Sequence, residues 1–194
     1  MLDIVRDLPI EEKAFFLIKK LVKDDVLFRE NETCRYVGIV MSGSLKIASY
    51  LSDGKEIIYN EPQTGSMFGN NLIFSSEPYY KGDIICVNDA EVWLIEKDDL
   101  TKLLRKDPVF LEAYLRSQSD FTKDLNDKIK LLAIAGAEER LLYYLNLHHN
   151  KINYPSISAL ARTLFLERET LSRTISRMEA RKSILRHDKT IELL

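Results

Sequence analysis

The chain has 194 residues, of which 45% are hydrophobic and 30% are charged, and its formal net charge is −2. This length allows one large domain or two small ones, and the hydrophobic content is that of a folded protein rather than a disordered one. No apolar run approaches a membrane span, and the first residues lack the pattern of a signal peptide, so we expect a cytoplasmic protein without a membrane partner.

The charge is distributed unevenly along the chain. Residues 156–194 contain eight Lys or Arg and five Asp or Glu, whereas the preceding 155 residues contain twenty and twenty-five. A basic C-terminal segment on an acidic body suggests a nucleic-acid partner for that segment.

The N-terminal half changes from helical to strand-like patterning. We expect a short helix over residues 8–23, with apolar faces from Phe15, Phe16, Ile18, Leu21 and Val22. The stretch "RYVGIVMSGSLKIASY" then alternates as a strand does, Asp53–Gly54 predicts a hairpin turn, and "GDIICVNDAEVWLIE" predicts two strands around Asn88–Asp89. Six of the seven glycines fall in this region, which indicates a small β-sandwich or barrel.

Helical patterns return after residue 96. "KDDLTKLLRKD" predicts a short helix capped by Asp98 or Asp99, and Asp107–Pro108 predicts the start of a long one. Apolar residues recur along the long helix at spacings near three and four, which favours self-association over a helix that faces only its own domain. The expected dimer interface consists of Phe110, Tyr114, Phe121, Leu125, Ile129 and Leu132.

Gly136 then marks a boundary or hinge, because glycine inside a helix costs about 1 kcal/mol relative to alanine. "EERLLYYLNLHHN" predicts a helix and "KINYP" a brief strand. Ser156 is the expected cap of a helix that runs to Thr163, with one buried stripe. The stripe consists of Ile157, Leu160, Ala161 and Leu164.

A second helix is expected from about residue 168 to 181, after a short turn at residues 165–167. On a helical wheel its apolar residues Leu171, Ile175 and Met178 share one side. The opposite side carries arginines, hydroxyls and a carboxylate, which suit the base edges of a major groove. These candidate DNA-binding residues are Arg168, Glu169, Ser172, Arg173, Ser176 and Arg177.

A solvated surface helix is the alternative for such a segment. The preceding helix and short turn favour a helix-turn-helix instead. So do the two β-rich pieces "SILRH" and "TIELL", joined by Asp188–Lys189, which resemble a two-stranded wing.

With these elements in this order, nearly the whole chain resembles the cyclic-AMP receptor protein and fumarate–nitrate regulator (Crp/Fnr) family. "RYVGIVMSGSLKIASYLSDGKEIIYNEPQTGSMFG" resembles its sensor β-roll, "GAEERLLYYL" the first helix of its DNA-binding domain, and "RETLSR" with "ILRHDKTIEL" its recognition helix and wing. The resemblance implies an α+β fold. Its parts are a cyclic-nucleotide-binding-type β-roll (jelly roll) over residues 1–106, a dimerisation helix and hinge over 107–135, and a winged helix-turn-helix over 136–194.

The recognition residues match both branches of this family. Arg168, Glu169 and Arg173 match the base-contacting residues of the cyclic-AMP branch, and Glu169, Ser172 and Arg173 match the fumarate–nitrate pattern that reads TTGA-type half-sites. Ser172 replaces the glycine of the cyclic-AMP branch, which favours the TTGA type. The sequence departs from the family at Phe165, where glycine often makes the turn, and at Glu167, where Ser or Thr is the typical cap.

The sensor residues match poorly. Asn70 stands where the family has the glutamate that binds ribose, and Tyr80 or Lys81 stands near the phosphate-binding arginine. A buried phosphate without arginine loses a bidentate, charge-assisted partner, so cyclic AMP is an improbable effector. The candidate effector pocket consists of Asn70, Asn71, Tyr79, Tyr80, Lys81, Leu125 and Asn126, for each of which a structural role is an equal alternative.

Other cofactors find no support in the sequence. The N-terminal cysteine cluster of iron–sulfur regulators is missing, and His148 and His149 lie beyond the long helix, where they are poor haem ligands. His187 lies in the expected wing, where phosphate contact is possible. Cys34 and Cys86 are interpreted as buried thiols, with a disulfide or a redox switch at Cys34 as alternatives.

The sequence therefore predicts a homodimeric regulator that reads an inverted-repeat DNA operator and responds to a small effector other than cyclic AMP. RNA polymerase is an expected partner if the protein activates transcription. The alternative is a ligand-binding module whose C-terminal helices bind another protein. We find no set of residues with catalytic or metal-ligand spacing, so an enzyme is the least favoured class.

Overall fold

The computed structural model describes residues 2–194, which divide into two compact units. The first unit extends to Asp120 and the second is Phe121–Leu194. The long helix α4, Pro108–Ala133, passes through the division between them. None of the described helices is both long enough and apolar enough to cross a membrane.

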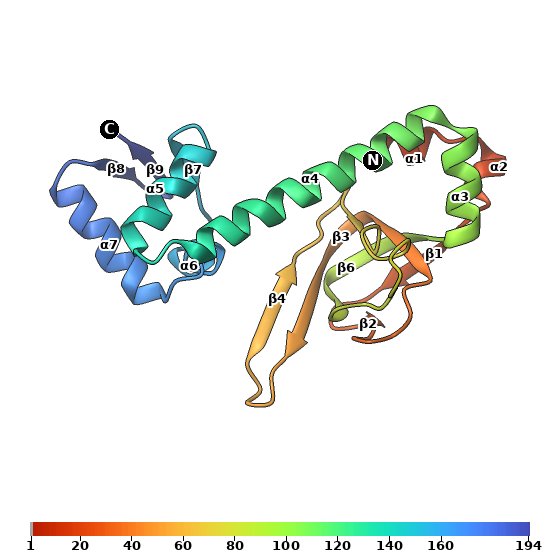
Figure 1. Cartoon of the computed structure of the whole chain (residues 1–194), viewed down its shortest axis with the longest axis horizontal. Helices are drawn as coiled ribbons and strands as arrows, with labels where there is room; N and C mark the ends of the chain where they lie inside the picture. The colour runs from red at the N-terminus through yellow and green to blue at the C-terminus, as the bar shows by residue number, and fades with distance from the viewer. Residues whose placement is uncertain (1) are drawn as a thin grey trace. The chain divides into compact units, whose positions relative to one another are not determined.

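The first unit is built on one antiparallel sheet with helices at its ends (Figure 1). The strand order is β1-β6-β3-β4, with β2 also paired to β6 and β5 to β3. The elements in chain order are α1 (Leu2–Asp7), α2 (Ile10–Lys13), β1 (Phe16–Leu21), β2 (Val26–Phe28), β3 (Tyr36–Tyr50), β4 (Glu56–Asn60), β5 (Met67–Phe68), β6 (Asp83–Glu96), α3 (Lys97–Lys106) and the start of α4.

The two long strands β3 and β6 form the centre of this sheet. Their pairing runs from Tyr36 opposite Glu96 to Ala48 opposite Asp83, with register shifts around Ser42 and Ser44. These irregularities allow a long strand pair to bend and twist, as a rolled sheet requires. Inward-facing residues of both strands then bury a continuous core, which includes Ile39, Leu45 and Leu94.

Three expectations for this unit need correction. Residues 8–23 do not form one helix, because Phe16–Leu21 pair with Ala90–Ile95 of β6 as strand β1. Residues 83–96 form one strand rather than two. Helix α3 has Glu96 at its N-cap position with no side-chain cap, so neither Asp98 nor Asp99 caps it; both lie in its first turn.

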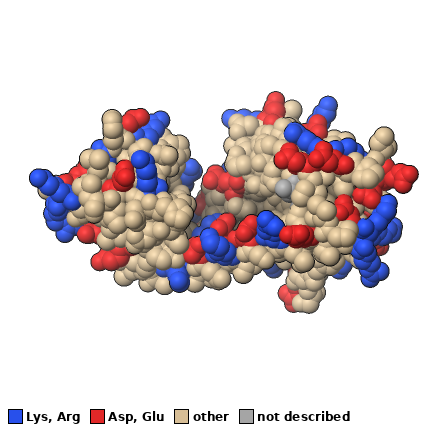
Figure 2. Space-filling model, turned by 90° about the horizontal axis from the view of Figure 1, so that it is seen from above, with Lys and Arg blue, Asp and Glu red and all other residues tan. Residues whose placement is uncertain are grey.

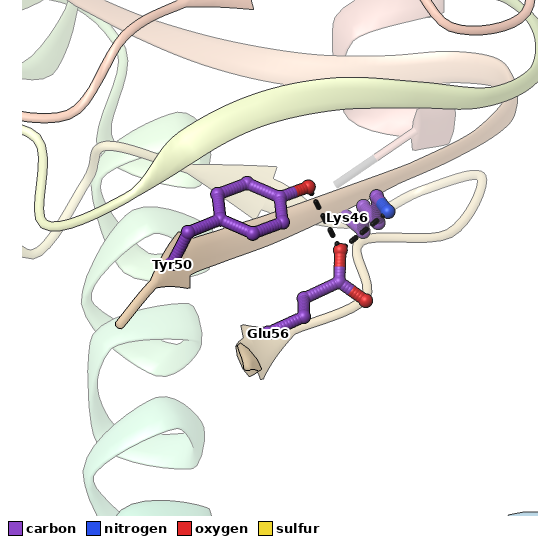
Figure 3. Close-up of polar contacts among 3 residues, drawn as sticks. All are labelled: Lys46, Tyr50 and Glu56. Carbon is purple, nitrogen blue, oxygen red and sulfur yellow. Dashed lines mark hydrogen bonds and ion pairs between the residues drawn. The ribbon is translucent and has the colours of Figure 1, made fainter. Parts of the chain in front are cut away.

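The hairpin of β3 and β4 projects from the rest of the sheet (Figure 1). Its turn contains Gly54 at φ +82°, and the Asp53 carboxylate accepts a hydrogen bond from the Lys55 amide. Glu56 on β4 accepts hydrogen bonds from Lys46 at 2.6 Å and from Tyr50 at 3.0 Å, both on β3 (Figure 3). The hydrogen bond to Glu56 raises the pKa of Lys46 and that of Tyr50, so Lys46 stays protonated and Tyr50 stays a neutral donor in the hairpin.

The long helix begins as the sequence predicts. The Asp107 carboxylate accepts hydrogen bonds from the amides of Val109 and Phe110, and Pro108 is the first helical residue. A proline is suited to this position because it needs no partner for an amide hydrogen.

The second unit packs three helices against a small antiparallel sheet of order β7-β9-β8. Beyond the end of α4, its elements are α5 (Ala137–Leu147), β7 (Lys151–Asn153), α6 (Ile157–Thr163), α7 (Arg168–Ala180), β8 (Ile184–His187) and β9 (Thr190–Leu193). The predicted helices, brief strand and wing are thus all present. Their shared core is apolar and includes Leu141, Leu145, Leu160, Leu164, Leu171, Ile175, Met178 and Ile191.

Candidate nucleic-acid interface

The helix-turn-helix is formed by α6 and α7. Ser156 caps α6 by accepting a hydrogen bond from the Ala159 amide, as predicted. At the other end the amide of Phe165 donates to Arg162 O and the amide of Leu166 donates to Ala161 O, which is the pattern of a Schellman turn. Phe165 has φ +52°, in the left-handed region that favours glycine. The sequence departure at this position is therefore a strained turn residue.

Helix α7 has the two faces that the wheel predicts. Leu171, Ile175 and Met178 are fully buried, and Thr174, which the wheel did not single out, is buried with them. All six candidate DNA-binding residues, Arg168, Glu169, Ser172, Arg173, Ser176 and Arg177, are exposed. Glu167 precedes the helix without a side-chain cap. The helix is thus held by its apolar face and leaves its polar face free.

Four of the six residues line one open hollow at the N-terminal half of α7. The hollow is lined by Arg168, Glu169, Ser172, Arg173 and, from α6, Ile157. The Arg173 guanidinium lies 3.6 Å from the Glu169 carboxylate, and both side chains are more than 80% exposed. An ion pair so exposed contributes little stability, so its groups are available to a partner at low cost.

The C-terminal half of α7 has a different environment. The Glu138 carboxylate on α5 lies 2.6 Å from Arg181 and 3.5 Å from Arg177. Arg177 is therefore partly engaged within the protein, unlike Arg168. Sequence reasoning missed Glu138, because only the packing of α5 against α7 brings it near these arginines.

The two-stranded wing follows α7 in the chain. Strands β8 and β9 pair from Ile184 opposite Leu193 to His187 opposite Thr190, and Asp188 makes their turn at φ +52°. His187 is exposed near the tip, and the Arg186 guanidinium donates to the Tyr154 hydroxyl.

Figure 2 shows acidic and basic side chains interspersed over the face that it presents, in keeping with a modest net charge.

The candidate effector residues do not form a comparable site. Asn70 is 4% exposed, and its side-chain amide donates to the Gln118 side chain on α4. Its backbone carbonyl accepts hydrogen bonds from the Gln118 amide at 2.6 Å and from the Tyr114 hydroxyl at 2.9 Å. Burial raises the pKa of Tyr114 to about 12, so it remains a donor at any ordinary pH. Asn70 therefore holds the long helix through groups that an effector would otherwise contact.

Tyr80 is part of the core rather than of a pocket wall. Its ring stacks on Phe28 with centroids 4.7 Å apart, and its hydroxyl donates to Tyr36 O. Only 2% of it is exposed, and burial raises the pKa of its hydroxyl. Its assignment to the effector pocket is corrected on this ground.

The remaining effector candidates are solvent-exposed. Asn71, Tyr79 and Lys81 are exposed in the first unit. Leu125 and Asn126 are exposed on α4 in the second unit. Gly69, at φ +73°, brings Asn70 close to the core, since a Cβ there would lie 2.7 Å from Tyr36 O.

The expected dimer interface is only partly exposed. Phe110 and Tyr114 are buried in the core of the first unit, so they are unavailable to a second copy. Phe121 is half-buried. Along α4 the exposed large apolar residues are Val109, Leu111, Leu115, Leu125, Ile129 and Leu132. The exposed Leu and Ile residues therefore start at Leu111 rather than at the buried Phe110.

Both cysteines are free and buried, as predicted. The Cys34 thiol lies 3.6 Å from the carbonyls of Tyr36 and Gly69, and burial raises its pKa. Among residues 2–194, no group of three or more His, Cys, Asp and Glu side chains has the geometry to hold a metal ion.

Comparison with known proteins connects these features. The profile of the cyclic nucleotide-binding domain matches residues 18–107. The anaerobic regulatory protein of Bacillus subtilis (strain 168) is 27% identical over 123 residues, which make up 63% of this chain and 52% of that protein. The chain thus spans about half the length of the curated relative that it matches.

Solved structures extend the likeness to nearly the whole chain. The c-di-GMP-responsive global regulator CLP of Xanthomonas campestris has a TM-score of 0.65 at 20% identity, covering 95% of this chain and 97% of that one. A CooA mutant from Carboxydothermus hydrogenoformans has a TM-score of 0.76 at 17% identity, covering 99% and 90%. At these identities the likeness establishes the fold. The expected α+β class is confirmed, with a cyclic-nucleotide-binding-type domain before a C-terminal helix-turn-helix.

Proposed function

We propose that the chain, which matches the cyclic nucleotide-binding domain profile and shares the fold of Crp/Fnr regulators, is a homodimeric, sequence-specific DNA-binding regulator of transcription of that family. In this proposal residues 1–106 sense an effector, 107–135 dimerise and 136–194 bind DNA. RNA polymerase is the further partner if the protein activates transcription.

One observation carries the proposal: the hollow on α7 collects two arginines, a carboxylate and a hydroxyl that are exposed and lightly engaged. Arg168 and Arg173 supply the bidentate donors that recognise guanine, Glu169 accepts from the cytosine amino group, and Ser172 reaches either a base or a phosphate. We infer TTGA-type half-sites because Ser172 stands beside Glu169 and Arg173 in this hollow.

Arg177 and Ser176 have a different part in the proposal. They lie farther along α7, and Arg177 is already near Glu138. Residues at the N-terminal end of a recognition helix contact base edges, whereas those farther along lie nearer the phosphate backbone. We therefore assign Ser176 and Arg177 to positioning contacts with phosphate.

A second copy is expected to pack along the exposed stripe of α4. Residues 111, 115, 118, 122, 125, 129 and 132 alternate steps of four and three, the spacing of a coiled-coil seam. Five of these are the exposed Leu and Ile residues, and Gln118 and Thr122 complete the pattern. Two-fold symmetry then implies an inverted-repeat operator whose half-sites lie about 34–36 Å apart.

The effector is proposed to be a small molecule other than cyclic AMP. At Asn70 the first unit lacks a carboxylate, and the Asn70 amide and carbonyl are occupied by α4. CLP, which shares the fold, is described as responsive to c-di-GMP, so the fold is compatible with other ligands.

The test is an Arg173→Ala variant in a gel-shift assay on a duplex with an inverted repeat of TTGA half-sites. Loss of one bidentate base contact costs about 1–3 kcal/mol, so we expect operator affinity to fall about 5-fold to 150-fold per half-site. Thermal stability should be unchanged, because the side chain is exposed.

Arg116→Ala is a matched control. Arg116 also pairs with a glutamate four residues earlier, Glu112, and its side chain is 70% exposed. It lies on α4 in the first unit, whereas Arg173 lies in the second. Operator affinity should stay at the wild-type value in this variant, whereas an unchanged affinity in Arg173→Ala would refute the assignment of α7.

A further inference from the structure

Arg140, near the start of α5, donates hydrogen bonds to backbone carbonyls. Its Nε donates to Ile134 O at 2.6 Å, and Nη2 lies 3.5 Å from Leu132 O. Its Nη1 donates to Phe165 O at 2.7 Å and to Leu164 O at 3.2 Å. One guanidinium thus joins two segments separated by thirty residues, the end of α4 and the helix-turn-helix turn.

Both segments are C-terminal ends of helices. Helix α4 ends at Ala133, and α6 ends at Thr163 with Leu164 as its C-cap. The last carbonyls of a helix lack intrahelical partners and carry the negative end of its dipole. A planar guanidinium with five donors serves two such ends at once, whereas an ammonium group on lysine is a single point charge.

The turn that Arg140 contacts determines where the recognition helix starts. Phe165, with φ +52°, is in a conformation that an L-residue keeps only when its surroundings hold it. Its carbonyl makes the shorter of the two Nη1 contacts, and α7 begins three residues later at Arg168. A change at Arg140 therefore acts on the direction in which α7 leaves the turn.

Other contacts fasten α5 to both helices. The Tyr143 hydroxyl donates to the Asp127 carboxylate on α4 at 3.0 Å, and the Lys130 ammonium lies over the Tyr143 ring. Glu138 holds the far end of α7 through Arg181. Contacts of α5 thus reach α4 on one side of Gly136 and α7 on the other. Through them α5 links the last turns of α4 to α7.

We propose that Arg140 is a positioning residue for DNA reading, which links the end of α4 to the turn that orients the recognition helix. The DNA part of this assignment rests on the proposed function. In this arrangement the segment at Gly136 transmits a displacement of α4 to α7, instead of acting as a free hinge.

The first test needs no DNA. Amide hydrogen exchange is measured in the full chain for the wild type, Arg140→Ala, Arg140→Lys and the control Arg116→Ala. Loss of one charge-assisted contact predicts about tenfold faster exchange at Phe165 and Leu166 in both Arg140 variants. Amides of β8 and β9 should keep their wild-type rates, which separates this effect from unfolding of the unit. Wild-type exchange at Leu166 in Arg140→Ala would overturn the proposal.

The second test measures affinity for the TTGA inverted-repeat duplex and for a random duplex of equal length. We expect Arg140→Ala and Arg140→Lys to lose about tenfold in the ratio of the two affinities, while random-duplex affinity is kept by the lysine variant. If Arg140→Lys had the wild-type amide exchange rates and the wild-type ratio of affinities, a positive charge alone would suffice. That result would overturn the bridging role of the guanidinium. A wild type without preference for the repeat would refute the proposed function, and with it the DNA part of the assignment. The exchange rates would then still decide whether Arg140 positions the turn.

Discussion

The recognition helix and the effector region differ in how much of their hydrogen-bonding capacity the protein itself uses. On α7, Arg168, Ser172 and Ser176 are exposed, and the Glu169–Arg173 pair is open to solvent. In the effector region, Asn70 is bonded to Gln118 and Tyr114, and Tyr80 is stacked in the core. A residue at a family's ligand-binding position serves a ligand only when its polar groups remain available. By this criterion we propose that the chain keeps a DNA-reading face on α7 and does not keep the cyclic-AMP site.

The largest expected effect concerns Tyr80. Replacing this buried aromatic residue with alanine should lower the free energy of unfolding by about 3–5 kcal/mol, as large-to-small core substitutions of aromatic residues do. Tyr79→Ala is its matched control, since Tyr79 is 44% exposed and should cost less than about 1 kcal/mol. Urea denaturation measures both. If both substitutions lowered the free energy of unfolding equally, Tyr80 would not be a core residue and would remain a candidate for the effector pocket.

The next effect concerns the link between Asn70 and α4. Gln118→Ala leaves a buried amide without its partner, which should cost about 1–3 kcal/mol of unfolding free energy. Ser119→Ala, on the exposed face of the same helix, is the control and should change little. If Gln118→Ala were as stable as the wild type and gained affinity for a nucleotide, Asn70 would be a ligand group that the helix only covers.

A smaller effect is expected at the exposed stripe of α4. Ile129→Asp places a charge in the proposed seam and should raise the dimer dissociation constant by about tenfold or more, which analytical ultracentrifugation measures. Ser119→Asp adds the same charge outside the seam and should leave the dimer intact. A monomeric wild type, or equal dissociation of both variants, would show that α4 has no dimer interface.

Much of the second unit and the start of α4 follow from local sequence signals. The helix starts at Ser156 and Asp107–Pro108, the buried stripe of α7 and the paired wing strands depend on neighbours close in sequence, and all are present. Phe165 stands out as an unusual turn residue because the Crp/Fnr pattern often has glycine there, and its φ of +52° agrees. Glu138 and Arg140 could not be identified in this way, because their partners lie on other elements.

The first unit was harder to predict because its contacts are long-range. Residues 16–21 carry apolar spacing that suits a helix, but pairing with β6 makes them a strand. Phe110 and Leu111 are adjacent on α4, and only the packing of the first unit shows that Phe110 is buried and Leu111 exposed. Likewise, nothing near Asn70 in the sequence indicates that Gln118, 48 residues away, is its partner.

The most direct test is the ratio of affinity for the TTGA inverted repeat to affinity for random duplex, measured on the wild type with and without a millimolar excess of cyclic AMP. Because the polar face of α7 is exposed and the polar groups of Asn70 are bonded to α4, we expect a ratio on the order of 10³ or more that cyclic AMP does not change. A ratio near one would contradict DNA reading by α7 and favour a protein partner for the C-terminal helices. A ratio that rises only when cyclic AMP is added would contradict the loss of the cyclic-AMP site.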